Sequence, residues 1–68
     1  MYTKLKELRI KKGYTVYDMG KLLKMSPSYY SQLENRRRNL SYDQAYKIAR
    51  VFKKRPDQIF FEEHKKIG

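Results

Sequence analysis

The segment between Ser26 and Arg38 constrains the fold of this chain more than any other part of the sequence. Ser26 is a favoured helix N-cap, and Pro27 suits the first helical position because its missing N–H has no partner to lose there. A helical period then places Tyr30 and Leu33 on one side, and this apolar side has to be buried. The opposite face is small, uncharged and able to form hydrogen bonds. Its members are Pro27, Ser28, Ser31, Gln32 and Asn35.

Two further helices are predicted before this segment. Thr3 is expected to cap a first helix that ends before Gly13, because glycine adopts a left-handed stop conformation without strain. Thr15 and Asp18 have the spacing of a capping box for a second helix. Gly20 inside that helix costs about 1 kcal/mol relative to alanine, so we expect another helix backbone to pass close to it.

Two helices are also predicted after the arginines. Ser41 and Gln44 form a second capping box, and Pro56 begins a fifth short helix. No strand-like alternation competes with the helical periodicity. The expected fold class is therefore all-α, a compact five-helix domain over residues 1–61. Residues 62–68 are expected to form a flexible C-terminal tail.

The charge balance narrows the possible partners. Lys and Arg total 17 and Asp and Glu total 7, which gives a net charge of +10 over 68 residues. This favours an anionic partner, such as nucleic acid, an anionic membrane or an acidic protein, over a merely solubilising surface. The longest apolar stretch is Ile59–Phe61 and the N-terminus lacks a signal-peptide core. We therefore expect a cytoplasmic protein that does not cross a membrane.

Nothing in the sequence supports catalysis or a bound cofactor. The chain has no cysteine, which excludes disulfides and thiolate metal ligands. Its only histidine, His64, lies beside Glu62 and Glu63, which is more typical of a solvated terminus than of a metal site. No nucleophile–base pair or glycine-rich phosphate loop is present. We expect a non-enzyme with no metal, cofactor or small-molecule ligand.

The seven tyrosines raise the question of base stacking. Packing is the simpler explanation for Tyr14 and Tyr30, which fall on core positions of the expected helices. Four others are expected at the surface, with their hydroxyls in water or on phosphates. These are Tyr2, Tyr17, Tyr29 and Tyr42.

The spacing of residues across these helices is similar to that of a known family. The matching positions include Thr15, Met19, Gly20, Leu23, Met25, Ser26, Tyr30, Leu33, Glu34 and Asn35. From about Leu5 to Phe60, without a gap, the chain resembles the helix-turn-helix domain of phage Cro and lambda-type repressors, also called the XRE family. The resemblance implies a lambda-repressor-like fold, binding of operator DNA and regulation of transcription. It also implies that the helix over residues 27–34 is the recognition helix and enters the major groove.

The resemblance assigns base reading to the uncharged face of that helix. The expected base-reading residues are Pro27, Ser28, Ser31 and Gln32. Gln32 is the leading candidate, because a glutamine can make a bidentate contact to adenine that discriminates by about 1–3 kcal/mol. Pro27 occupies a position that often carries a long polar side chain, so it can only pack on a thymine methyl or a sugar edge.

Phosphate contacts are expected on both sides of the recognition helix. The three arginines after it offer bidentate geometry and counterion release, which add affinity rather than base selectivity. Val16 replaces a glutamine that often binds phosphate in the family, so Tyr17 or Lys21 is expected to substitute. The full set of expected phosphate ligands is Tyr17, Lys21, Tyr29, Asn35, Arg36, Arg37, Arg38 and Tyr42.

Other matches and departures concern the fold itself. Arg9 and Glu34 match a pair that many family members join as a salt bridge between the first and third helices. Lys24, Arg36 and Lys53 stand where the family commonly has glycine. Either these turns are rearranged, or the side chains are held at positive φ at a cost on the order of 1 kcal/mol.

The leading hypothesis is a sequence-specific, repressor-type transcription regulator that binds double-stranded DNA as a homodimer. The expected dimer seam lies at the fourth and fifth helices, with Pro56, Phe60 and Phe61. One alternative is a non-specific architectural DNA binder, which the same charge would suit. The other is a protein-interaction module, such as an antitoxin or a repressor-modulating protein, which would use the apolar surface of Leu22, Val51 and Phe61.

Overall fold

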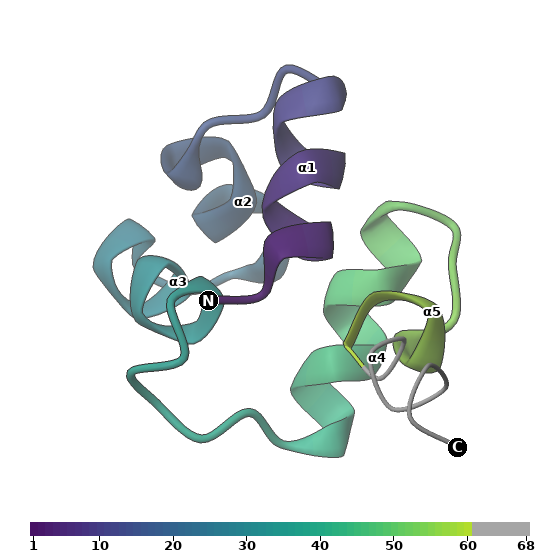
Figure 1. Ribbon diagram of the computed structural model, residues 1–68. Coiled ribbons are helices and arrows are strands. Elements are labelled where there is room, and N and C mark those ends of the chain that lie inside the picture. The colour runs from purple at the N-terminus through teal and green to yellow at the C-terminus, as the bar shows by residue number, and fades with distance from the viewer. Residues whose placement is uncertain (61–68) are drawn as a thin grey trace.

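The computed structural model describes residues 1–60 and places five helices and no strand among them (Figure 1). The helices are α1 (Thr3–Lys11), α2 (Val16–Leu23), α3 (Pro27–Glu34), α4 (Tyr42–Val51) and α5 (Pro56–Phe60). This confirms the expected all-α, five-helix fold. The expected tail over residues 62–68, the domain boundary at 61 and the seam residue Phe61 lie outside the described residues.

Local side-chain caps start α2, α3 and α4 where the sequence predicts. The Thr15 hydroxyl accepts a hydrogen bond from the Asp18 backbone N–H at 3.1 Å, and the Asp18 carboxylate accepts one from the Thr15 N–H at 2.8 Å. Hydrogen bonding of the Asp18 carboxylate to Thr15, first of all to its backbone N–H, lowers the pKa of Asp18. The same reciprocal box joins Ser41 and Gln44 at 3.1 and 3.2 Å. The Ser26 hydroxyl caps α3.

The expected cap at Thr3 is wrong. Thr3 is the first helical residue, and Tyr2 is the N-cap without a side-chain hydrogen bond. The Tyr2 backbone N–H donates to the Glu34 carbonyl at 2.9 Å, which ties the start of the chain to the end of α3. Because this contact turns the chain into α1 one residue early, tertiary structure overrides the local signal.

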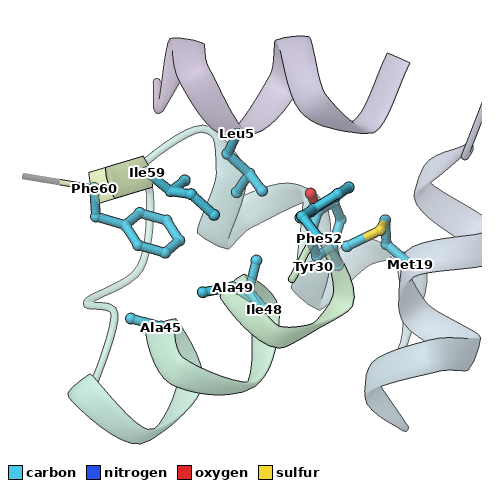
Figure 2. Close-up of a cluster of buried hydrophobic side chains, with 9 residues drawn as sticks. All are labelled: Leu5, Met19, Tyr30, Ala45, Ile48, Ala49, Phe52, Ile59 and Phe60. Carbon is cyan, nitrogen blue, oxygen red and sulfur yellow. The ribbon is translucent and has the colours of Figure 1, made fainter. Parts of the chain in front are cut away.

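Each helix contributes side chains to one small core (Figure 2). Leu5 from α1 faces Ile48 and Ala49 of α4, and α5 closes the far side with Ile59 and Phe60. Met19 and Tyr30 extend the cluster into the α2–α3 pair, and both are completely buried. The core therefore fixes the orientation of α3 relative to the rest of the domain.

The turn between α2 and α3 is tight. A Cβ atom added to Gly20 would lie 2.7 Å from the Met25 carbonyl oxygen and 3.1 Å from the Pro27 nitrogen. The expected close approach is therefore confirmed, but the nearest backbone is that of the turn that leads into α3 and of its first residue, not the body of a helix. Lys24 makes the turn with a left-handed backbone (φ 58°), and Arg36 and Lys53 share this conformation (φ 61° and 56°). The turns are not rearranged; the non-glycine residues adopt the strained conformation.

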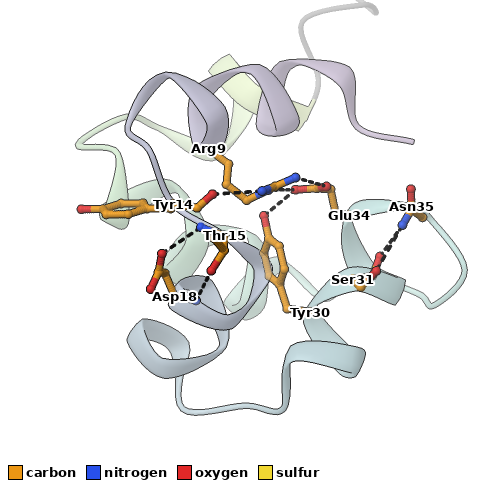
Figure 3. A network of polar contacts seen from close by, with 8 residues as sticks. All are labelled: Arg9, Tyr14, Thr15, Asp18, Tyr30, Ser31, Glu34 and Asn35. Carbon is orange, nitrogen blue, oxygen red and sulfur yellow. Dashed lines mark hydrogen bonds and ion pairs between the residues drawn. The ribbon is translucent and has the colours of Figure 1, made fainter.

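A buried ion pair joins α1 to the end of α3 (Figure 3). Arg9 donates from Nε and Nη2 to the two Glu34 carboxylate oxygens at 2.8 and 3.2 Å, and from Nη1 to the Tyr14 carbonyl at 2.9 Å. The Tyr30 hydroxyl donates to Glu34 Oε1 at 2.8 Å. The salt bridge that the resemblance implies is therefore present, and Glu34 is only 4% exposed.

Arg9 and Tyr30 both keep their protons in this cluster. Hydrogen bonding to Glu34 raises the pKa of Arg9, so the guanidinium stays charged. Burial, followed by the hydrogen bond to Glu34, raises the pKa of the Tyr30 phenol far above its ordinary value. Tyr30 is therefore a neutral donor at all physiological pH values. Within residues 1–60, no fully buried side-chain nitrogen or oxygen lacks a hydrogen-bond partner.

Replacing Gly20 with alanine should destabilise the domain by about 1–3 kcal/mol, because the new methyl group would push against backbone atoms that have little room to move. Urea denaturation of Gly20→Ala and of the parent chain measures the difference in the free energy of unfolding. Lys21→Ala, an exposed change on the same helix, serves as the control and should shift it by less than about 0.5 kcal/mol. Equal stability of Gly20→Ala and the parent chain would contradict the tight turn.

Glu34→Ala should lower the free energy of unfolding by about 3–5 kcal/mol, because it leaves the Arg9 charge and the Tyr30 hydroxyl without their partner. The exposed pair Asp43–Lys47, whose nitrogen and oxygen are 3.2 Å apart, provides the control. Lys47→Ala should cost no more than about 1 kcal/mol. Thermal and urea denaturation compare the two variants, and similar losses in both would show that burial of the Arg9–Glu34 pair does not matter.

Tyr30→Phe should change how stability depends on alkaline pH. In the parent chain the folded-state pKa of Tyr30 lies above the unfolded value of about 10. The unfolded chain therefore releases this proton first, and stability is lost as pH rises above about 10, by up to about 1.4 kcal/mol per pH unit. Tyr30→Phe lacks this contribution. Urea denaturation between about pH 8 and pH 11 should give a flatter curve of stability against pH for the variant. Parallel curves for the variant and the parent chain would refute the assignment.

Candidate nucleic-acid interface

The polar edge of α3 projects outward from a buried anchor. Tyr30 and Leu33 are completely buried, whereas Ser28 on the opposite face is exposed. The other three expected base-reading residues are half-buried and lie along the same edge. These are Pro27, Ser31 and Gln32. The helix therefore offers an uncharged ridge to the outside, as its period indicates.

Gln32, Arg38 and Tyr29 are brought together beside this ridge. Arg38 Nε donates to Gln32 Oε1 at 2.6 Å. The Arg38 guanidinium carbon lies 4.8 Å from the centre of the Tyr29 ring, in cation–π range. The Tyr29 hydroxyl accepts a hydrogen bond from Gln44 Nε2 at 3.0 Å, so Tyr29 is fastened to the start of α4.

Two of the three arginines after α3 lie over aromatic rings. The Arg36 guanidinium carbon lies 4.8 Å from the Tyr2 ring centre, and Tyr2 in turn packs edge-on against Phe60. Arg38 stacks on Tyr29 instead. Tyr2, expected at the surface, is therefore a half-buried support for Arg36. Adjacent like charges are thus accommodated without an anion between them.

Arg37 differs from its two neighbours. Its side chain is exposed and makes no hydrogen bond, ion pair or ring contact with any residue of the described range. Its backbone N–H donates to the Gln32 carbonyl at 2.8 Å, which fixes its position after α3. Of the three arginines, Arg37 therefore has the guanidinium group with the largest number of N–H donors free to bind a ligand.

Asn35 has a partner within α3. Its Nδ2 donates to the Ser31 carbonyl at 2.9 Å and approaches the Ser31 hydroxyl at 3.4 Å (Figure 3). The Ser31 carbonyl also accepts from the Asn35 backbone N–H at 3.0 Å, so the side chain adds a second hydrogen bond to it. Tyr42, at the first position of α4, is 71% exposed. The structure gives no contact between Tyr42 and the other expected phosphate ligands.

A second group of expected ligands lies at the other end of α3. A shallow groove between α2 and the start of α3 is lined by Tyr17, Lys21, Lys24 and Pro27, with Asp18 on its wall. Tyr17 is 71% exposed, and Lys21 and Lys24 are exposed as well. Cationic and hydroxyl groups therefore flank the ridge on this side too.

Sequence reasoning missed the part played by Gln44 and by Tyr2. Gln44 could have been found, because its oxygen is used in the capping box and its NH₂ group is left to donate elsewhere. Nothing in the sequence indicated the role of Tyr2, because its contacts with Arg36 and Phe60 join residues far apart along the chain.

Two of the residues expected in the dimer seam are not free to contact a second copy. Pro56 and Phe60 are both buried within the single chain. The apolar surface proposed for a protein partner does exist in part, because Leu22 is 51% exposed beside half-buried Val51. Within residues 1–60, no group of three or more His, Cys, Asp or Glu side chains is placed to hold a metal ion. In the same range no helix has the length and apolar content needed to span a membrane.

Comparison with solved structures supports the fold. Two crystal structures of the clp gene regulator ClgR from Corynebacterium glutamicum are similar to this chain. One has 22% sequence identity and a TM-score of 0.77, over 96% of this chain and 84% of ClgR. The other has 22% identity and a TM-score of 0.78, over 94% and 68%. At this identity the likeness shows a shared fold.

The search of curated proteins found no match. The family model for the helix-turn-helix, HTH_3, matches residues 5–59, a range that contains α2, the turn, α3 and α4 completely. This match covers most of the chain and agrees with the resemblance seen in the motif spacing. The chain therefore belongs to the Cro/C1-type helix-turn-helix family, the XRE family, whose members are DNA-binding transcription regulators.

Proposed function

We propose that this protein is a sequence-specific, repressor-type regulator that places α3 in the major groove of operator DNA. The observation that carries the proposal is the uncharged outer ridge of α3, anchored from below by Tyr30 and Leu33 at zero exposure. An α-helix fits the major groove of B-DNA, where each base pair shows a distinct pattern of donors and acceptors. A ridge of hydroxyl and amide groups can read such a pattern without desolvating a charge.

Base contacts in this proposal come from one face of α3. The residues are Pro27, Ser28, Ser31 and Gln32. Ser28 and Ser31 can donate to or accept from several base edges, so they add little selectivity. Gln32 has the longest polar side chain on the ridge and carries most of the discrimination.

Phosphate contacts flank these residues and supply affinity. On the α2 side they come from Tyr17 and Lys21, which line the groove beside Pro27. On the other side they come from Tyr29, Asn35, Arg36, Arg37, Arg38 and Tyr42. Arg37 leads this group because its guanidinium has no partner among residues 1–60. The net charge of +10 supports a strongly salt-dependent interaction.

The proposed active form is a cytoplasmic homodimer that binds a near-palindromic site. Two copies of α3 would then enter successive major grooves about 34 Å apart. Pro56 and Phe60 are internal to the single chain, so an interface at α4 and α5 would have to use their exposed residues instead. Sedimentation of the chain with one selected duplex determines the stoichiometry directly. The similar fold of ClgR, a clp gene regulator, is consistent with a regulatory role.

Gln32→Ala should abolish discrimination at one base pair of the selected site, a loss of about 1–3 kcal/mol for that sequence and little for scrambled duplex. Selection of DNA from a random pool, followed by competition with scrambled duplex, provides the measurement. Arg37→Ala is the matched comparison. It should weaken binding to all sequences alike and reduce the slope of log affinity against log salt by about 1.

Three results would separate this proposal from its alternatives. Equal affinity of the chain for selected and scrambled duplex would leave only the architectural role. A shift of the selected site that survives Gln32→Ala unchanged would remove α3 as the reading helix. Absence of any DNA complex at low salt, together with stoichiometric recovery of a protein partner that Leu22→Asp abolishes, would favour the interaction module.

A further inference from the structure

The amide group of Gln32 is oriented before any DNA is present. Arg38 Nε donates to its oxygen at 2.6 Å, across six residues of chain. Arginine has donors and no acceptor, so the atom that faces it has to be the Gln32 carbonyl oxygen. This fixes the direction of the Gln32 amide group. Both N–H bonds of Gln32 Nε2 are left without a partner among the described residues.

Arg38 is held in this position by contacts of its own. Its guanidinium lies over the Tyr29 ring, 4.8 Å from the centre. The Tyr29 hydroxyl accepts from Gln44 Nε2 at 3.0 Å, and Gln44 Oε1 accepts from the Ser41 backbone N–H at 3.2 Å. The Tyr29 ring is therefore a fixed platform between α3 and α4, and a planar guanidinium stacks on it better than an ammonium would.

The orientation of the amide decides which base edge Gln32 can match. A bidentate contact to adenine needs the Gln32 oxygen to accept from the base N6–H while Nε2 donates to N7. Here Arg38 already donates to that oxygen at 2.6 Å, so a base N6–H would have to share the oxygen with a guanidinium whose positive charge repels a second donor. Together the two side chains present donors, from Gln32 Nε2 and from the Arg38 Nη atoms. The guanine edge in the major groove offers two acceptors, N7 and O6, and suits such a surface.

We propose that Arg38 is a specificity-determining residue, which holds Gln32 as a hydrogen-bond donor so that the chain reads guanine where a free glutamine would read adenine. The inference rests on the proposed function, because it names the base that the same ridge selects. It differs from the adenine contact that the sequence alone suggests. Removal of Arg38 frees the Gln32 oxygen and returns the side chain to adenine.

The test measures base preference rather than affinity alone. The full chain, Arg38→Ala and Arg37→Ala are titrated by fluorescence anisotropy against duplexes based on the sequence that the full chain selects, with each base pair replaced in turn. At the position whose preference disappears in Gln32→Ala, the full chain should bind guanine about tenfold more tightly than adenine. Arg38→Ala should lose or reverse that preference. Arg37→Ala should weaken all duplexes alike and keep it.

A second variant tests the platform. Tyr29→Leu keeps apolar volume between α3 and α4 but removes the ring beneath Arg38, so it should reduce the guanine preference in the same direction as Arg38→Ala. Thermal denaturation provides the folding control for both variants. Arg38 is exposed, so Arg38→Ala should melt with the parent chain.

Two results would overturn the inference while leaving the proposed function intact. One is an adenine preference of the full chain at the Gln32-dependent position. The other is an Arg38→Ala variant that loses affinity equally on all duplexes and keeps the guanine preference, which would make Arg38 a phosphate ligand only. A full chain that selects no sequence at all would overturn the proposed function and the inference together.

Discussion

The position of α3 depends on one buried carboxylate. Glu34, the last residue of that helix, is 4% exposed and receives hydrogen bonds from Arg9 and from the Tyr30 hydroxyl. A carboxylate in this environment is costly unless its partners are all in place, so the arrangement tolerates little displacement of α1 against α3. The Tyr2 backbone contact to the Glu34 carbonyl reinforces the same junction. The position of the outer ridge of α3 is therefore set from inside the domain.

Much of the fold could be predicted because its signals are local. The caps of α2 and α4 lie within three residues of their partners, and the close approach at Gly20 follows from the cost of a glycine inside a helix. The prediction failed at Thr3, because a hydrogen bond between Tyr2 and Glu34, which lie far apart in the sequence, decides where α1 begins. It also failed to foresee that Phe60 packs on Tyr2 inside the chain and is not free for a partner. The spacing of residues along the sequence does not show which side chains meet in the fold.

The candidate site also has a part that the sequence predicts and a part that it does not. Periodicity alone predicts that Ser28 lies opposite Tyr30, and the structure agrees. The partners of the arginines could not be predicted, because the left-handed backbone at Arg36 sends consecutive side chains in different directions. Arg36 meets Tyr2 and Arg38 meets Tyr29, so part of the charge is organised by aromatic rings before any phosphate arrives. A bound nucleic acid would meet a surface that is already ordered.

The most direct test of the central claim is a titration of the ¹⁵N-labelled chain with a selected duplex, followed by amide chemical shifts. We expect the largest changes on the outer ridge of α3, at Ser28 and Gln32, and on the loop with Arg37. Amides of the buried side, such as that of Leu33, should move much less. Changes concentrated instead around Leu22 and Val51, with the α3 ridge unaffected, would contradict the placement of α3 in the groove.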